Sequence, residues 1–370
     1  MAIKLGLLSG KGGSGKTTLG LTIASFLNSM GLKILLIDCD MATNGASYFF
    51  EKKYHSSLLT LNSIRKGIIE GKELLQIKYN FDFIPTIIHA PYKRNSSMEK
   101  EEYFINYVNE IDENYDVIIF DCQAGYSENM ESILSLTNTN LIVMEPDAIS
   151  SSAVRVLYSQ IAEYLETKST YQIFNKISAE EKAKYANISM GTMFTALPPL
   201  SFNWDIRECF AYSRVPEADI SNLEFFLTVY DIVKVIIGEY REDLINEDYI
   251  TKLVAPHQKV LESELTYRRR QRTKAIGRWR NKISITNYIA VGAIVVAACG
   301  IISNFVFVNS ELQIINIALI FCYLVITAIL FNMGKKELLS EMNSQEEEMR
   351  KNIKEIEDDI KILMKYRKKI

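Results

Sequence analysis

The sequence has few of the residues from which disulfide frameworks and metal centres are built. Its five cysteines include no C-x-x-C pair, and its three histidines are isolated from one another. A disulfide scaffold and a cysteine- or histidine-rich metal site are therefore not indicated. Long uncharged apolar runs are also absent from residues 1–282, so no membrane span is predicted there.

Chain length limits the number of domains, and the net charge hides an uneven distribution of charge. A chain of 370 residues can hold one large α/β core and about one further module. The formal net charge of −3 conceals a basic cluster late in the chain. A buried strand is predicted at the very start of the sequence, so we expect no signal peptide.

A phosphate-binding loop follows that first strand. Residues Ser9–Thr18 read S-G-K-G-G-S-G-K-T-T and satisfy the pattern G-x-x-x-x-G-K-[ST] between a strand and a helix start. Backbone N–H groups of such a loop close around phosphates at a positively polarised helix end. We expect Lys16 to reach the β- and γ-phosphates and Thr17 to hold Mg²⁺. The nucleotide-binding residues are predicted to be Gly10, Lys11, Gly12, Gly13, Ser14, Gly15, Lys16, Thr17 and Thr18.

The extra lysine, Lys11, narrows the class of P-loop protein to which the loop is similar. With Lys11 the loop reads K-G-G-x-G-K-T-T, which resembles the deviant Walker A loop of the MinD/ParA ATPases. The resemblance implies ATP as ligand and a homodimer of the ATP-sandwich type, in which Lys11 crosses to the partner's nucleotide. Lys11 and Lys16 are then both catalytic candidates. Lys11 could instead only add local charge beside the triphosphate.

Two aspartates end a second apolar run. Asp38 and Asp40, followed by Asn44, resemble the family's D-x-D-P-Q-x-N switch I segment, although Met41 and Ala42 replace Pro-Gln. The resemblance makes Asp40 the candidate for orienting the attacking water. Asp38 could instead be a strand-end cap.

A third apolar run, Val117–Phe120, leads to Asp121 and the segment D-C-Q-A-G. Four apolar residues that deliver an aspartate to a strand end are typical of a Walker B motif. We expect Asp121 to bind Mg²⁺ through water and the Gly125 amide to sense the γ-phosphate. Later segments also resemble the family, and there Asn175 would face adenine, or else cap its strand. The resemblance covers about residues 1–240.

Predicted strands and helices alternate along this part of the chain. That alternation predicts an α/β fold class with a doubly wound, mostly parallel P-loop sheet. The motifs fall at the carboxyl ends of strands, where ligands of such sheets bind. The predicted strands are Ile3–Leu8, Lys33–Asp38, Phe81–Pro85, Val117–Phe120, Asn140–Met144 and Tyr171–Asn175.

The last third of the chain is of a different kind. The uncharged runs Ile289–Val308 and Leu312–Phe331 are separated by three residues, and each is long enough to span a bilayer of about 30 Å. Basic residues crowd the approach to the first run, and Lys335 and Lys336 follow the second. The positive-inside rule then predicts a transmembrane hairpin in the cytoplasmic membrane with both termini in the cytoplasm.

Flanking helices complete the predicted division into an ATPase domain (1–240), a helical basic linker (241–282), the hairpin (283–333) and a coiled-coil tail (334–370). Because the basic cluster adjoins a span, we expect contact with membrane lipid and no direct binding of nucleic acid. In the tail, apolar residues recur every seven positions. They favour self-pairing, with pairing to a partner or folding back on the linker left open. The heptad residues are Leu339, Met342, Met349, Ile353, Ile356, Ile360, Leu363 and Ile370.

These features predict a membrane-anchored Mg-ATPase that acts as a dimerisation switch and recruits, positions or gates an unidentified protein partner. A subunit that energises a transporter, or a phage-defence or envelope-assembly component with the same switch, stays open. A capsular-type tyrosine autokinase is disfavoured because the tail holds only Tyr366. A related synthetase would need a substrate pocket that the sequence does not locate.

Overall fold

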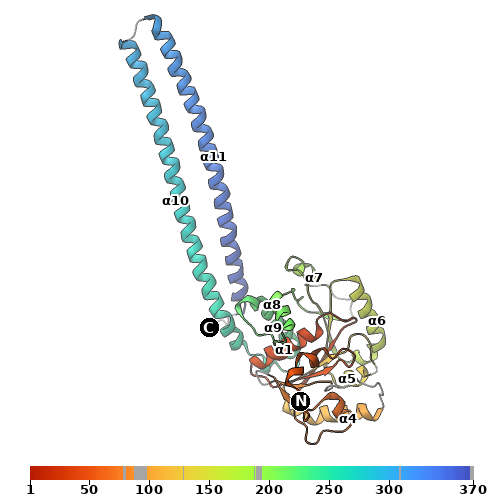
Figure 1. The fold of residues 1–370 in the computed structure, drawn as a ribbon. Coiled ribbons are helices and arrows are strands. Elements are labelled where there is room, and N and C mark those ends of the chain that lie inside the picture. Colours follow the sequence, from red (N-terminus) through yellow and green to blue (C-terminus); the bar gives the residue numbers. More distant parts are fainter. Residues whose placement is uncertain are drawn as a thin grey trace. The chain divides into compact units, whose positions relative to one another are not determined.

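The computed structural model describes residues 1–77, 81–86, 98–127, 129–186, 188, 194–307 and 310–366. These residues belong to two compact units, Met1–Tyr249 and Ile250–Ile370. The first unit contains the described strands, and the second consists of two long helices (Figure 1). Val308 and Asn309, between the two apolar runs, and Ile370, the last heptad residue, lie outside the described residues.

An eight-stranded sheet forms the centre of the first unit, in the order β3-β4-β2-β5-β1-β6-β7-β8. Every pair is parallel except β3 with β4. The predicted α/β class is therefore confirmed, and the two-residue edge strands β3 and β8 are additions that carry too short a pattern to predict. The strands are β1 (Ile3–Leu8), β2 (Ile34–Cys39), β3 (Leu75–Gln76), β4 (Asp82–Ile84), β5 (Val117–Cys122), β6 (Thr139–Met144), β7 (Ser169–Phe174) and β8 (Thr195–Ala196).

Helices alternate with these strands. The α-helices of the first unit are α1 (Lys16–Ser29), α2 (Gly45–Phe49), α3 (Leu61–Ile64), α4 (Met98–Ile111), α5 (Met130–Leu136), α6 (Ala148–Leu165), α7 (Lys182–Tyr185), α8 (Trp204–Ala211) and α9 (Leu223–Gly238). Short 3₁₀ turns are η1 (Glu51–Lys53), η2 (Asp112–Asn114), η3 (Ala179–Glu181), η4 (Ile220–Asn222) and η5 (Glu242–Leu244).

The sheet is covered on both faces, which explains why its inner strands are apolar throughout and not alternating. On one face, Ile37 and Phe120 belong to a buried cluster that includes residues of α3, α4, α5 and α6. On the other face α1 packs closely against β1, since a Cβ added at Gly20 would lie 2.8 Å from Leu7 Cδ1.

The register of β2 and β5 brings two predicted motifs together. Asp38 is the Cα partner of Asp121, and Cys39 is the Cα partner of Cys122. Both strands extend one residue past their aspartate, so the two carboxylates lie side by side near the carboxyl edge of the sheet. The two cysteines are free and buried.

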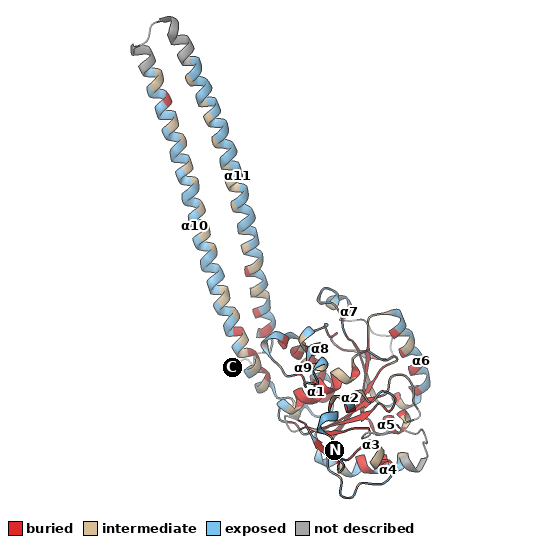
Figure 2. Ribbon diagram, viewed as in Figure 1, coloured by how far each residue is buried: buried red, intermediate tan, exposed pale blue. Residues whose placement is uncertain are grey.

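The second unit consists almost entirely of α10 (Glu247–Phe307) and α11 (Ser310–Met364). Each helix runs without interruption through a predicted boundary, at 282/283 in α10 and at 333/334 in α11, so the four-part division of the chain stays a proposal. Both helices are long and apolar enough to cross a membrane by length and composition. In their most apolar described windows only 6% and 0% of the residues are buried (Figure 2).

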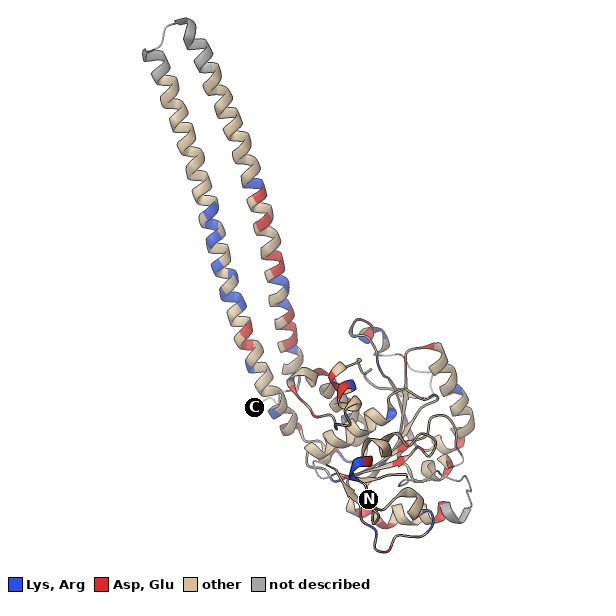
Figure 3. Ribbon diagram, viewed as in Figure 1, with Lys and Arg blue, Asp and Glu red and all other residues tan. Residues whose placement is uncertain are grey.

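Charges of the second unit lie away from the apolar stretches. Basic residues of α10 and acidic residues of α11 gather in the described segments that flank those stretches (Figure 3). Arg272 pairs with Glu346 at 2.7 Å and Arg269 pairs with Glu357 at 2.6 Å.

The heptad face of the tail is its least exposed face, with Ile353, Ile360 and Leu363 buried. In this structure the tail therefore folds back along α10 of the same chain, one of the alternatives left open by the sequence. Self-pairing of the tail between two copies stays a prediction.

Candidate nucleotide site

The phosphate-binding loop joins β1 to α1. Its glycines at 13 and 15 have φ values of 81° and 92°, a left-handed conformation that favours glycine. The helix begins at Lys16, which is 6% exposed. The first-turn N–H groups of α1 and the Lys16 ammonium therefore come from one short segment, as phosphate binding requires.

Gly10 and Gly12 differ in whether packing requires a glycine at their positions. A Cβ at Gly10 would lie 2.3 Å from the Ala153 carbonyl carbon, so close packing against α6 demands glycine there. A Cβ at Gly12 would meet nothing within 4 Å. The glycine at position 12 is thus not required by packing among the described residues.

Thr17 and Asp121 are brought together at the end of the loop. Thr17 Oγ1 donates a hydrogen bond of 2.6 Å to Asp121 Oδ2, while Asp121 Oδ1 is buried without a hydrogen-bond partner among the described residues. Burial raises the pKa of Asp121 to about 6, against the opposing charge of Lys16. A hydroxyl beside a carboxylate with a spare oxygen fits Mg²⁺, which favours hard oxygen ligands and retains water.

The two switch-segment aspartates hold the loop after β2. Asp38 Oδ2 accepts bonds from the Ser47 N–H (2.8 Å) and Oγ (2.6 Å), which secures the first turn of α2. Burial, with the neighbouring Asp121 charge, raises the pKa of Asp38 to about 7. Asp40 accepts from the Thr43 N–H (2.9 Å) and Oγ1 (2.6 Å), so its carboxylate stabilises a tight turn.

The same segment lies beside the phosphate-binding loop. A Cβ at Gly45, the first residue of α2, would lie 3.6 Å from Thr17 Oγ1. Asn44, which precedes it, has a φ of 52° and a buried Oδ1 without a hydrogen-bond partner among the described residues. The predicted switch residues and the predicted Mg²⁺ ligands are therefore neighbours in space.

Lys11 is held by two carboxylates of its own chain. Its Nζ lies 3.0 Å from Glu145 Oε2 and 3.1 Å from Asp147 Oδ2. These hydrogen bonds raise the pKa of Lys11, first through Glu145 and then through Asp147. Sequence reasoning missed this pair of partners, because nothing in the sequence sets the distance between the loop and the segment after β6.

Gly125 and Asn175 both have hydrogen bonds to the loop region. The Gly125 N–H donates to the Ser9 carbonyl at 2.8 Å. Asn175 Nδ2 donates to the Ser14 carbonyl at 2.8 Å, and its Oδ1 accepts from the Lys176 N–H at 2.9 Å. γ-Phosphate sensing by Gly125 and adenine contact by Asn175 stay predictions, and each would need these bonds to be shared or exchanged.

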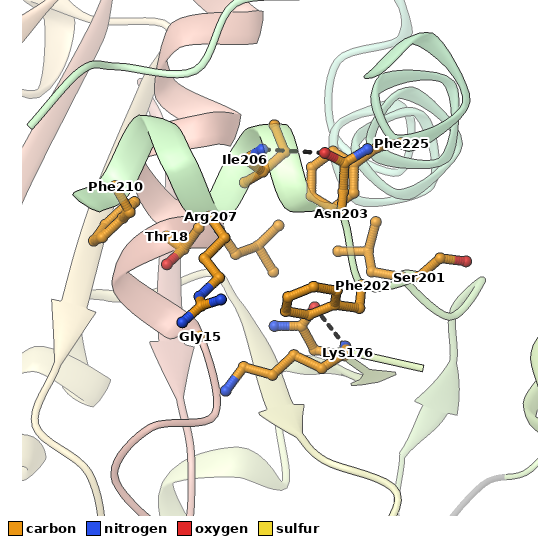
Figure 4. Close-up of a pocket in the computed structure, with 13 residues that line it drawn as sticks. Gly15, Thr18, Lys176, Ser201, Phe202, Asn203, Ile206, Arg207, Phe210 and Phe225 are labelled. Atoms are coloured by element: carbon orange, nitrogen blue, oxygen red, sulfur yellow. Dashed lines mark hydrogen bonds between the residues drawn. The ribbon is translucent and has the colours of Figure 1, made fainter. Parts of the chain in front are cut away.

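A cavity of about 310 Å³ lies next to the loop. Figure 4 shows Phe202, Arg207 and Lys176 around it, with Gly15 and Thr18 on the side of the phosphate-binding loop. Its walls combine aromatic rings with cationic side chains, which suits a planar, polar ligand attached to phosphates. Phe202 lies just before α8 and Arg207 lies within it, and no sequence motif assigns either side chain a role.

Comparison with known proteins shows what the first unit resembles. Residues 4–173 match the protein family described as AAA domain. The chain is 28% identical to an uncharacterized ATP-binding protein of Methanocaldococcus jannaschii, covering 49% of this chain and 66% of the relative. It is 25% identical to the septum site-determining protein MinD of Bacillus subtilis, covering 40% of this chain and 54% of that protein. The chain thus spans about two thirds or less of these curated relatives.

Solved structures share the fold. A candidate plasmid partition protein of Borrelia burgdorferi bound to AMPPNP matches with a TM-score of 0.54 and 18% identity, covering 64% of this chain and 100% of that one. The MinC:MinD cell division complex of Aquifex aeolicus gives 0.52 and 20% identity, covering 64% of this chain and 96% of that one. Together with the AAA-domain match over residues 4–173, they show that the first unit has the P-loop fold of MinD and plasmid partition proteins.

Proposed function

We propose, for a chain whose first unit is a P-loop domain of the MinD/ParA type, that it is a membrane-anchored ATPase. It binds and hydrolyses Mg-ATP, and ATP switches its ATPase domain from monomer to dimer. The switch recruits, positions or gates a protein partner at the cytoplasmic face of the membrane.

One observation carries the ATPase part of this proposal. Lys16, Thr17 and Asp121 meet at the carboxyl edge of the sheet, with the Thr17 hydroxyl 2.6 Å from the Asp121 carboxylate. Lys16 supplies charge to the β- and γ-phosphates, and the Thr17–Asp121 pair holds Mg²⁺, with Asp121 acting through water. The neighbouring cavity accommodates the nucleoside, and Mg²⁺ held by the Thr17–Asp121 pair would supply positive charge beside the phosphates.

The dimer switch rests on Lys11. Its side chain is 30% exposed, and its ammonium is paired with Glu145 and Asp147 of its own chain. A partly exposed ion pair is weak, so Lys11 can leave it at small cost when a second nucleotide offers a phosphate. Relatives of this type supply the precedent for partners, since one solved structure is a complex of MinC with MinD.

Membrane anchoring rests on the second unit. The central parts of α10 and α11 expose large apolar side chains, among them Val296 at 67% and Leu330 at 64%. Water would penalise that exposure by about 25 cal/mol per Å² of apolar surface, whereas lipid would not. The flanking basic residues then orient both helix ends toward the cytoplasm.

The test of the switch is ATP-dependent assembly and turnover. A fragment of residues 1–249 should sediment as a monomer with ADP and shift to a dimer with a non-hydrolysable ATP analogue. Lys11→Ala should lose that shift and the hydrolysis that depends on it, while Lys33→Ala, an exposed lysine outside the site, should not. Sedimentation that does not respond to nucleotide would contradict the switch.

The test of anchoring is cysteine labelling in intact cells. A cysteine at Ser310, between the spans, should react with an impermeant reagent from outside, and one at Ser344, in the tail, should not. Labelling of position 344 from outside would contradict the proposed hairpin.

A further inference from the structure

A buried arginine lies behind the switch segment. Arg65 follows α3 directly and is only 3% exposed. A buried charge is costly unless it is paired and hydrogen-bonded, so its partners indicate what it is there to hold. None of the motifs that point to nucleotide binding accounts for this residue.

Helix α4 and the N-cap residue of α5, Asn129, supply partners of Arg65. Its NH2 group forms an ion pair of 3.1 Å with Glu101 Oε2 on α4, and its guanidinium carbon lies 5.5 Å from the Phe104 ring centroid. In the amide orientation that satisfies its neighbours, Asn129 accepts from Arg65 NH1 at 3.1 Å and donates to Glu101 Oε1 at 3.1 Å. Ser132 Oγ on α5 donates to Glu101 Oε2 at 2.5 Å, which completes the network.

The remaining contact reaches the switch segment. Arg65 NH1 lies 2.7 Å from the Met41 sulfur, and Met41 is itself only 8% exposed. Met41 directly follows Asp40, whose carboxylate accepts from the Ala42 and Thr43 N–H groups of the same turn. The Arg65 guanidinium therefore contacts the side chain of Met41, the residue next to Asp40, which is expected to orient water.

We propose that Arg65 is a positioning residue for ATP hydrolysis. It fixes the Asp40–Thr43 turn through Met41, and it ties that turn to Asn129, the N-cap of α5, which comes four residues after Gly125. The two segments expected to face the γ-phosphate are thereby held in one arrangement, with Glu101 connecting both to surface helix α4. This inference rests on the proposed ATPase function.

The shape of the side chain explains why arginine is used here. A guanidinium has five N–H donors in a rigid plane and can contact Met41, Asn129 and Glu101 at once. A lysine ammonium would preserve the charge beside Glu101 but could not span all three partners. A lysine variant therefore removes the positioning contacts while it keeps the positive charge beside Glu101.

Steady-state hydrolysis by the full-length protein in detergent tests the inference. Arg65→Lys and Met41→Leu should each lower kcat about tenfold while leaving KM for ATP unchanged, since small displacements of catalytic groups affect the chemical step. The double variant should lose little more than either single variant, because both changes break the same contact. Lys66→Ala, the exposed neighbouring lysine, is the matched control and should keep the wild-type kcat.

The outcomes separate this inference from the proposed function. Wild-type kcat in both variants, or a raised KM with unchanged kcat, would overturn the positioning role. If Arg65→Lys melts below the assay temperature, Met41→Leu decides alone, since Leu and Met are close in volume. If the wild-type protein shows no ATP hydrolysis that is lost on substitution of Lys16, the ATPase function itself is refuted.

Discussion

The two units treat the same kind of side chain in opposite ways. Leu36, in a central strand of the first unit, is 1% exposed, whereas Leu330, in α11, is 64% exposed. The first unit covers its apolar residues with its own helices, and the second leaves a long apolar surface for something else to cover. This difference supports the proposal that the two units lie in different surroundings, the first in water and the second in lipid.

Charged groups differ between the units as well. In the first unit Lys4 and Asp112 form a buried ion pair of 3.2 Å, and Arg65 is buried with Glu101. In the second unit pairs such as Arg350 with Glu346 lie on helix surfaces one turn apart. Buried pairs fix geometry because their partners cannot be exchanged for water, whereas exposed pairs contribute little.

The largest effect should come from charging the apolar surface of the second unit. Val296→Lys together with Ile326→Lys should move the full-length protein out of the membrane fraction. Each lysine at the centre of a span costs about 3 kcal/mol, or about 6 kcal/mol for two. Val260→Lys with Ile362→Lys, at exposed apolar positions outside the predicted spans, is the matched control. Equal fractionation of both variants would show that the exposed surface does not face lipid.

The next effect concerns the phosphate-binding loop. Lys16→Ala should reduce ATP turnover by about 10³-fold, because it removes a fixed charge aimed at the transferring phosphoryl group. Membrane fractionation should be unchanged, since the substitution touches only the first unit. Turnover measured by phosphate release checks the first expectation, and turnover near the wild-type level would remove Lys16 from the site.

Matched leucine truncations sharpen the comparison directly. Leu36→Ala should lower the free energy of unfolding by about 2–5 kcal/mol, because the cavity in the covered sheet cannot collapse fully. Leu330→Ala should change the free energy of unfolding in detergent by less than about 0.5 kcal/mol. A large loss at Leu330 would instead reveal that α11 packs against another protein surface there.

The smallest expected effect is a pH dependence of the first unit. Burial raises the pKa of Asp38 to about 7, beside Asp121, so the folded state keeps a proton that the unfolded state releases near pH 4. The stability of fragment 1–249 without nucleotide and metal should therefore fall as pH rises from about 4 to about 7. Urea unfolding across that range checks it. Asp38→Asn keeps an acceptor for Ser47 and should make the profile less steep, with the raised pKa of Asp121 accounting for the remaining slope. A profile that rises with pH would contradict the raised pKa of Asp38.

Much of the fold, and the places of the candidate site residues within it, followed from local patterns. The loop at Ser9–Thr18, the position of Asp121 at a strand end and the parallel sheet all depend on residues a few positions apart, and the sheet has the predicted class. The pairing of Lys11 with Glu145 and the contact of Arg65 with Met41 escaped prediction. Each joins segments more than 20 residues apart, and no periodicity records the distance between them.

The sequence by itself determined six of the eight strands, where the phosphate-binding loop lies, and that the last third carries two long apolar runs. These depend on side-chain period and on backbone preferences of residues close in the chain. Only the tertiary structure decided that Asp38 and Asp121 share a register, that Asn175 bonds to the loop, and that the tail folds back along α10. Those outcomes depend on how separate elements pack, because burial and electrostatic strength are set by whatever surrounds a group in space and not by its neighbours in sequence.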